Sequence, residues 1–401
     1  IIYKNAWLNI YNVPVVYFPK FFHPDPTVKR QSGFLEPNLI SSKTLGDSLY
    51  TPYFYVISDD KDLTIKPRFY EDKTKFILQN EFRQKTQKSI TIADFSYTRG
   101  YQSLRVDDSK DSRTHLFTKT IMDLNFDNFI KSDLEINFQK TSNDSYLKLF
   151  ELESPLLLGD NSVLESVIKL DLEEDKYNFT TSIERYESLG GSNSDRYQYI
   201  LPSYNFSRLY NLEEFYGSLN LNSYGNNTLR QTNVVTTSVI NDLDYTTYNY
   251  YFDNGIKNDF GMYVKNLNSV GKNDNNYKTS PQSELMSAYV INSSYPLIKK
   301  DSKNLNTFEP KISLRYSPHD MKKYSGTAAR INMSNIYSIN RLGMSDSFEE
   351  GQSLTLGFDY RKEKIKNGNL KEMDNFFNIK MATVIRDKEE KNIPFNSTIG
   401  K

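Results

Sequence analysis

From about Pro52 onward, apolar and polar side chains alternate along the chain in one segment after another. In residues 133–139, Leu, Ile and Phe alternate with charged or amide side chains. Because successive side chains of a strand point to opposite faces of a sheet, this alternation predicts β-strands with one apolar and one polar face. The same pattern recurs at residues 62–66, 168–173, 311–316 and 354–361.

Polar linkers of two lengths separate these predicted strands. One short linker covers residues 71–74, whereas residues 190–195 and 272–276 belong to longer ones. Short turns that alternate with longer loops are typical of outer-membrane barrels. The composition agrees, since 37% of the residues are hydrophobic but 14% are aromatic. A barrel in lipid needs a polar lumen and aromatic girdles, so the predicted fold class is all-β, a partial large antiparallel transmembrane β-barrel.

A soluble β-sandwich, a β-helix or a set of sandwich domains is the alternative. Alternation alone does not exclude them, because any half-buried strand shows it. Against them stand the charged side chains on the polar faces and the lack of a fixed repeat period. The membrane barrel is therefore the favoured interpretation.

Several function classes are disfavoured. Lys and Arg number 50, as do Asp and Glu, so no net charge favours nucleic acid as a partner. The chain has no cysteine, and therefore no thiolate metal site or nucleophile. Its histidines, His23, His115 and His319, are widely separated and show no shared carboxylate or hydroxyl arrangement. We predict a protein that is not an enzyme, with no catalytic residues, metal site or cofactor.

The segment 13–37 is rich in proline and aromatic residues. Proline cannot donate a hydrogen bond to a β-ladder, so this segment predicts an extended connector between two folded units. Residues 1–28 are too few to bury a core of their own. We interpret them as the end of a β-domain plus connector, and residues 29–401 as the N-terminal part of the barrel. The chain begins at Ile1 and is interpreted as a fragment of a longer protein.

Motifs in this segment resemble the junction of the LPS-assembly outer-membrane proteins, the LptD or organic-solvent-tolerance family. In that family, a periplasmic jelly-roll ends in a strand that here contains Pro14, Tyr17 and Pro19. A basic sequence then leads into the barrel, and its counterparts here are Arg30, Ser32, Gly33 and Phe34. Weaker motifs follow in family order at residues 52–55, 62–67, 80–83, 144–146 and 308–311.

The chain departs from the family pattern in three ways. Most of the jelly-roll is missing upstream, and the chain stops short of the strands that would complete a family-sized barrel. The family's cysteines also have no counterpart here. The resemblance thus covers a fragment: the last jelly-roll strands and part of the barrel.

The resemblance implies a component of an outer-membrane translocon. Such a protein inserts lipopolysaccharide into the outer leaflet through a hydrated lumen and a lateral gate. The implied partners are lipopolysaccharide, an LptE-like plug lipoprotein, an LptA-like periplasmic jelly-roll bridge and the outer-membrane bilayer. The implied location is the cell outer membrane, with the N-terminal segment in the periplasm.

Pro37 and Pro52 are the candidate gate residues. They lie 15 residues apart (52 − 37), one in each of the first two predicted barrel strands. Each removes a hydrogen-bond donor from its ladder and so weakens pairing there. In the resembled family, prolines at these positions are associated with the lateral gate. The alternative is that they only mark strand starts, and the connector prolines are expected to stiffen the chain.

Other readings stay open from the sequence. A passive porin or nutrient receptor would use a similar barrel, and an outer-membrane hydrolase would need a Ser, His and carboxylate site. The basic pair at residues 29–30 could contact lipid A phosphates or lie at a headgroup interface. Carboxylates at residues 173–175 and at Asp346, Glu349 and Glu350 could bind divalent cations, but are more simply explained as solvated loops.

Overall fold

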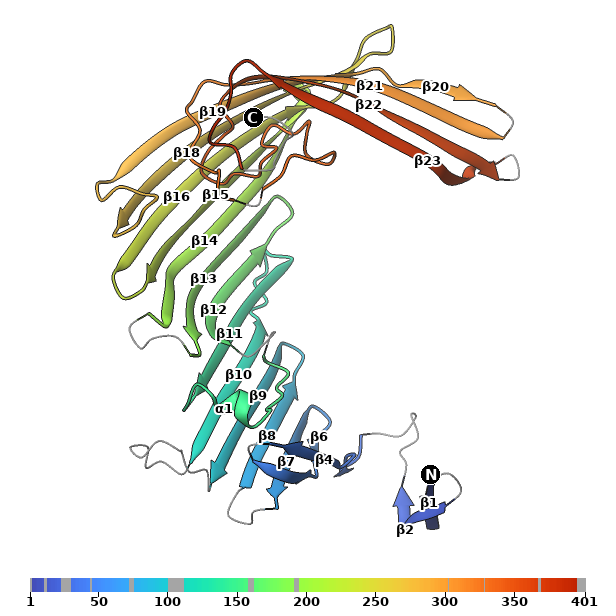
Figure 1. Cartoon of the computed structure of the whole chain (residues 1–401), viewed down its shortest axis with the longest axis vertical. Helices are drawn as coiled ribbons and strands as arrows, with labels where there is room; N and C mark the ends of the chain where they lie inside the picture. Colours follow the sequence, from blue (N-terminus) through green and yellow to red (C-terminus); the bar gives the residue numbers. More distant parts are fainter. Residues whose placement is uncertain are drawn as a thin grey trace. The chain divides into compact units, whose positions relative to one another are not determined.

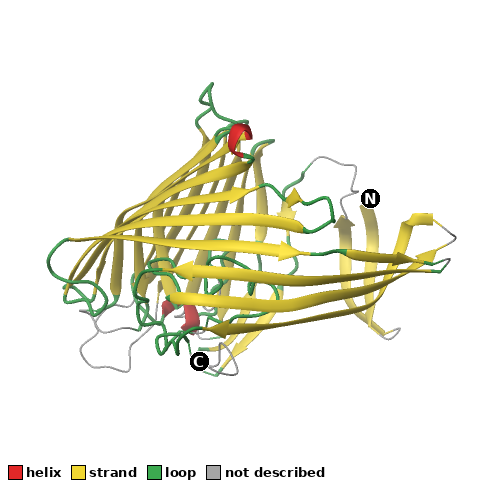
Figure 2. Cartoon of the chain, turned by 90° about the horizontal axis from the view of Figure 1, so that it is seen from above, coloured by secondary structure: helices red, strands yellow, loops and turns green. Residues whose placement is uncertain are grey.

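A computed structural model shows a chain built almost wholly from antiparallel strands. Helical structure within the described residues is limited to α1 (Tyr146–Leu149) and η1 (Glu213–Phe215) (Figure 2). The described residues are 2–10, 13–22, 30–43, 45–71, 76–99, 112–157, 162–190, 195–301, 303–327, 329–366 and 369–394. The structure confirms the predicted all-β, barrel-like fold class, and the predicted strands are present at all five segments that alternate.

The strands follow one another with few interruptions (Figure 1). Their bounds are β1 (Ile2–Ile10), β2 (Val13–Phe22), β3 (Gly33–Phe34), β4 (Asn38–Ser42), β5 (Gly46–Tyr50), β6 (Tyr53–Ser58), β7 (Lys61–Tyr70), β8 (Phe76–Lys85), β9 (Ser89–Arg99), β10 (Arg113–Asp123), β11 (Lys131–Thr141), β12 (Val163–Glu173), β13 (Tyr177–Ser188), β14 (Tyr197–Leu212), β15 (Gly217–Arg230), β16 (Val234–Thr247), β17 (Tyr250–Tyr251), β18 (Lys257–Lys272), β19 (Gln282–Ser294), β20 (Leu297–Lys300), β21 (Asn304–Ser317), β22 (Gly351–Lys366) and β23 (Asn369–Arg386).

The chain divides into two compact units. Unit 1 comprises Ile1–Phe126, Ser132–Leu170 and Glu184–Gln198, and unit 2 comprises Asp127–Lys131, Asp171–Ile183 and Tyr199–Lys401. The predicted domain boundary after residue 28 falls within residues 23–29, which lie outside the described residues, so it stays a prediction.

In unit 1, β1 and β2 form a two-stranded sheet of their own. Strands β7, β8, β9, β10 and β11 pair in sequence order, each antiparallel to the next. Ahead of them, β6 and β5 both pair with β7, and β3 and β4 pair with β6 and β5 respectively. Pairing of sequence neighbours is the meander that short turns favour.

In unit 2, the long strands β15, β16, β18, β19, β21, β22 and β23 pair in the same manner (Figure 1, yellow-green to red). The short strands β17 and β20 add to the ends of β18 and β21. Each unit is thus a meander of neighbouring antiparallel strands.

The two faces of these strands have the polarity opposite to that of a soluble protein. In β21, Leu314 is 53% exposed whereas its neighbour Arg315 is 4% exposed. In β11, Ile136 and Phe138 are exposed while Gln139 is buried. The soluble sandwich alternative requires the apolar faces to be buried against each other. Here the apolar face is outside and the polar face is covered.

Connecting segments cover the polar face in both units. In unit 1, residues 142–157 accept hydrogen bonds from strand side chains, including Arg68 Nη1 to the Phe150 carbonyl at 2.6 Å and Gln139 Nε2 to the Leu156 carbonyl at 2.7 Å. In unit 2, the connection 318–350 between β21 and β22 plays the same part. Arg315 Nε donates to the Ile339 carbonyl at 2.7 Å. These contacts explain why polar strand residues are buried.

Candidate functional site

The two candidate gate prolines lie where the first strands are interrupted. Pro37 follows β3 and directly precedes β4, and Pro52 lies between β5 and β6. Pro37 is exposed, whereas Pro52 is buried. Neither proline lies inside a strand: β3 with β4, and β5 with β6, each form one run that is interrupted at its proline. Their role as a gate stays a prediction.

The two interruptions face each other across the sheet. The Leu35 N–H donates to the Pro52 carbonyl at 2.8 Å, next to the Gly33–Phe54 and Phe34–Tyr53 pairs of β3 and β6. On its other side, the Thr51 N–H donates to the Pro67 carbonyl at 3.2 Å. Pro67, in β7, was not singled out from the sequence, although it lies 15 residues after Pro52 (67 − 52). The repeated spacing was the signal that could have found it.

Three predicted junction residues contact β6 in this same region. The Val56 N–H donates to Ser32 Oγ at 2.9 Å, and the rings of Phe34 and Tyr53 meet edge to face with centroids 5.0 Å apart. Gly33 pairs with Phe54 in the ladder. The junction sequence is therefore held on β6 by backbone and side-chain contacts.

Arg30 forms an ion pair with Asp62, and its guanidinium carbon lies 5.4 Å from the centre of the Phe54 ring. The Asp62 side chain is only 3% exposed, and Arg83 Nε lies 3.6 Å from its second oxygen. Arg30 is thus paired with a carboxylate of the same chain. The two sequence hypotheses, lipid A phosphates and a headgroup interface, did not include this partner. Lys29 lies outside the described residues.

The remaining junction residues lie elsewhere. Pro14, Tyr17 and Pro19 belong to β2, in the separate two-stranded sheet. Tyr17 donates to Asn5 Oδ1 at 2.7 Å, and its ring lies 5.0 Å from that of Trp7. The structure therefore brings Arg30, Ser32, Gly33 and Phe34 together with the gate prolines, and places the other three in the first hairpin.

A cluster of arginines holds the connection 318–350 on unit 2. Arg341 binds Glu349 through two hydrogen bonds of 2.6 Å, and Arg386 Nε donates to Glu349 Oε1 at 2.9 Å. Burial alone would raise the pKa of the Glu349 carboxyl. The bonds and charge of Arg341, with the charges of Arg315 and Arg386, outweigh this and lower that pKa from 4.5 to about 2. The carboxylate stays ionised and clamps the connection.

The acidic residues weighed as cation ligands have other partners. Asp346 accepts hydrogen bonds from the hydroxyls of Tyr277 and Tyr324. Glu350 accepts from the Met321 N–H at 3.4 Å, and Glu174 from the Lys176 N–H at 2.9 Å. Within the described part of the chain, no group of three or more His, Cys, Asp or Glu side chains is arranged to hold a metal ion.

One sequence expectation is wrong. His115 does share a hydroxyl and a carboxylate: its Nδ1 lies 2.6 Å from Ser96 Oγ, and its Nε2 lies 3.2 Å from Asp94 Oδ1. The sequence did not reveal this because strand register brings the residues together from β9 and β10. All three side chains are buried, and the Tyr146 hydroxyl bonds to Ser96 Oγ at 2.6 Å. The cluster fastens α1 to the strands.

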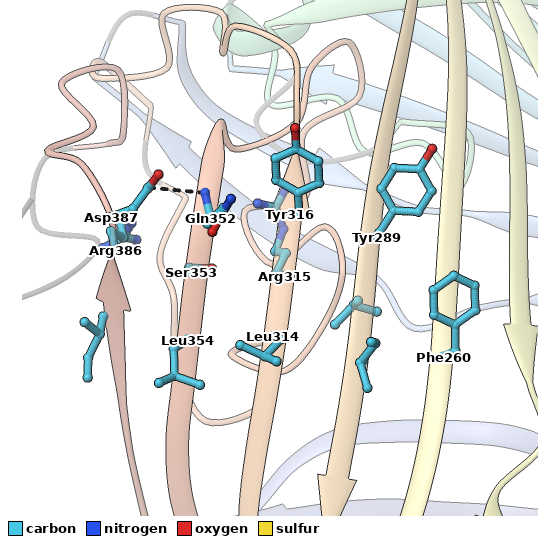
Figure 3. Close-up of a pocket in the computed structure, with 13 residues that line it drawn as sticks. Phe260, Tyr289, Leu314, Arg315, Tyr316, Gln352, Ser353, Leu354, Arg386 and Asp387 are labelled. Atoms are coloured by element: carbon cyan, nitrogen blue, oxygen red, sulfur yellow. Dashed lines mark hydrogen bonds between the residues drawn. The ribbon is translucent and has the colours of Figure 1, made fainter.

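The outer face of unit 2 carries a groove of about 510 Å³ across β18 to β23. Its lining is mostly aliphatic and aromatic, with Leu314, Leu354 and Phe260 toward one end (Figure 3). Tyr289 and Tyr316 lie side by side above them, with both hydroxyls directed toward the end that carries Gln352 and Asp387 (Figure 3). Tyrosines between an apolar band and a polar end are typical of the girdle of an outer-membrane barrel.

The chain is similar in sequence to LPS-assembly proteins of several bacteria. The chain is 38% identical over 93 residues to the LPS-assembly protein LptD of Pseudomonas aeruginosa, which covers 23% of this chain and 10% of that protein. The predicted resemblance to LptD proteins is confirmed. The LptD of Pseudoalteromonas translucida is 39% identical over 93 residues, covering 23% of this chain and 12% of that protein.

A longer match connects half of the chain to the same group of proteins. The LptD of Pseudomonas fluorescens is 26% identical over 207 residues, which is 51% of this chain and 21% of that protein. These matches thus span between a tenth and about a fifth of the length of the LptD relatives. No family model matches the chain. Among the described residues, no helix is both long and apolar enough to cross a membrane.

Proposed function

We propose that this chain is part of an outer-membrane β-barrel that takes part in lipopolysaccharide assembly. Two findings support the proposal. The relatives are named as LPS-assembly proteins, and the strands expose their apolar face while burying Arg, Gln and Ser on the other. The second finding carries the proposal, because an exposed apolar face is stable only against lipid or another apolar surface.

The proposed activity is delivery of lipopolysaccharide to the outer leaflet without covalent chemistry. The sugar portion would cross on the polar side of the strands, where it stays hydrated. The acyl chains need an apolar path and therefore a lateral exit. Pro37 and Pro52 are the proposed lateral gate, and their position at two facing strand interruptions supports this assignment.

The proposed partners follow from the same assignment. An LptE-like plug lipoprotein would occupy the lumen, and LptA-like jelly-roll proteins would form the periplasmic bridge by strand addition. The first hairpin, β1 and β2, would belong to the periplasmic side of that bridge. The barrel itself would lie in the outer membrane.

Photo-crosslinking in the full-length protein in cells tests the gate. A photoreactive amino acid replaces Leu39, which is exposed on β4 beside Pro37, and in a matched control replaces Leu285, which is exposed on β19. We expect lipopolysaccharide adducts at residue 39 in clear excess over residue 285, because only the first exposed site borders the gate. Equal adducts at both sites, or none at residue 39 while lipopolysaccharide reaches the surface, would contradict the proposal.

A further inference from the structure

Three prolines recur at equal spacing along the three strand runs that follow the first hairpin, namely β3 with β4, β5 with β6, and β7. Pro37, Pro52 and Pro67 are each separated by 15 residues (52 − 37 and 67 − 52). The Thr51 to Pro67 bond lies in the same register as the pairs on either side, Tyr50 with Arg68 and Tyr53 with Ile65. The pairing register between the second run (β5 with β6) and β7 is therefore continuous. The hydrogen-bond ladder between them is interrupted at residues 51–52.

A ladder hydrogen bond is missing on each of the two edges of this second run. In an antiparallel ladder, two hydrogen-bonded residues exchange both N–H···O bonds. Thr51 donates to the Pro67 carbonyl, but Pro67 has no N–H to return to the Thr51 carbonyl. Leu35 donates to the Pro52 carbonyl, and Pro52 likewise returns nothing. Two adjacent residues thus each lose one ladder bond, on opposite edges of the run.

We propose that Pro67 is a third positioning residue of the gate, and that the hairpin of β4 and β5 is the part that moves. This inference rests on the proposed function and assigns the hinge to residues 51–52. The lateral opening is then a swing of strands β4 and β5 away from β7, with β3, β6 and β7 staying paired. If only Pro37 and Pro52 lacked a backbone donor, the run of β5 and β6 would keep all of its ladder bonds to β7.

The attachment of this hairpin to β7 is short. It consists of the pairs Ser48 with Tyr70, Leu49 with Phe69 and Tyr50 with Arg68, and of the Glu71 N–H donating to the Asp47 carbonyl at 2.9 Å. By contrast, β7 pairs with β8 along nearly its whole length, from Lys61 to Phe69. The weak ladder therefore lies on the hairpin side of β7.

In the closed position, one buried apolar side chain holds the hairpin turn against the core of unit 1. Leu45 is buried with Tyr70 and Ile77 in the core cluster of unit 1. Opening requires this side chain to leave the cluster, so the hairpin rests closed until a ligand compensates for the lost burial. The lipid chain of the cargo has the chemistry to occupy the vacated apolar site.

Unit 2 offers a matched control with the same local geometry. Tyr295 precedes Pro296 between β19 and β20, and its N–H donates to the Pro310 carbonyl of β21 at 3.1 Å. Substitution of Pro310 therefore makes the same chemical change in the same ladder setting, away from the proposed gate in the sequence.

The test compares Pro67→Ala with Pro310→Ala in the full-length protein. The new N–H at residue 67 restores one ladder bond to Thr51, and we expect amide exchange in residues 46–50 to slow by about three- to tenfold. We also expect slower surface delivery of lipopolysaccharide and fewer adducts from a photoreactive residue 39. Pro310→Ala should slow exchange near residue 295 only and leave delivery unchanged. Pro67→Val is a second variant in case the alanine variant is poorly assembled.

The outcomes separate this inference from the proposed function. Unchanged exchange in residues 46–50 of both Pro67 variants overturns the hinge. Slower exchange with unchanged delivery overturns the role of Pro67 in gating. Adducts at residue 39 of the unmodified protein report on the proposed function independently, so their absence with delivery intact counts against that function and not against the hinge.

Discussion

Single residues that lack a donor or a side chain decide where these strands can pair closely. Pro37, Pro52 and Pro67 remove ladder donors, and the sequence predicted this for the first two because proline chemistry is local. Gly357 in β22 does the opposite and allows close approach. A Cβ there would collide with the Tyr337 hydroxyl of the connection 318–350 and with the Met381 carbonyl of β23.

Substitution of this glycine tests how tightly the connection is packed. We expect Gly357→Ala to destabilise the protein by about 1–3 kcal/mol, because the methyl group forces backbone or side-chain shifts in a filled space. Gly326→Ala is the control, since a Cβ at residue 326 meets nothing within 4 Å. Thermal unfolding of the full-length protein in detergent measures both, and equal stability of the two variants would refute the packing argument.

At the scale of elements, the connections 142–157 and 318–350 are as important as the strands. They give partners to buried side chains such as Arg68 and Arg315 on the polar face. The sequence predicted loops at some turns but not that these two would fold back onto the strands. The Arg341–Glu349 clamp joins groups that no local pattern connects.

We expect the docking of the connection 318–350 onto the strands to weaken at low pH. The folded-state pKa of Glu349, about 2, lies below the ordinary value of 4.5, so its stabilising effect is complete above about pH 4.5 and is lost as pH falls toward 2. We expect proteolysis or amide exchange of residues 318–350 to accelerate over this range.

Neutral variants provide the comparison. Glu349→Gln leaves Arg341 and Arg386 without their carboxylate, and removal of one partner of a buried pair costs about 3–5 kcal/mol. We expect fast exchange in that variant at every pH. Glu389→Gln, at an exposed carboxyl in unit 2, should behave like the unmodified protein. Exchange that does not change with pH in the unmodified protein would contradict this account.

At the scale of the whole molecule, the reversed polarity of the strand faces is the dominant physical fact. Exposed leucine, isoleucine, phenylalanine and tyrosine recur along the outer faces of both units. Single tyrosines and leucines on a surface are ordinary, but their recurrence on successive strands is typical of the lipid-facing band of the outer-membrane barrel that we propose. The sequence foresaw this band because strand alternation has a period of two.

These 401 residues contain no cysteine, so a cysteine introduced on the exposed apolar face has no native competitor within this part of the protein. In membrane vesicles that contain the full-length protein, we expect a water-soluble maleimide to modify Thr307→Cys much faster than Leu314→Cys. Thr307 lines a polar pocket with Glu309 and Asp359, whereas Leu314 lies on the exposed apolar face of the same strand. Rapid modification of both cysteines would mean that the apolar face is in water.

Local sequence patterns are enough to predict the strands, the polarity of their faces and two of the three positions without a backbone donor, because each depends on side chains close together in the chain. Which segments cover the polar face, and which groups meet there, became known only from the folded arrangement of the strands and connections. Asp94 and His115, or Arg341 and Arg386, are neighbours only after register and folding are set. The role proposed for Pro67 also depends on the fold. The N–H that proline lacks matters only because the Thr51 carbonyl faces it in the ladder.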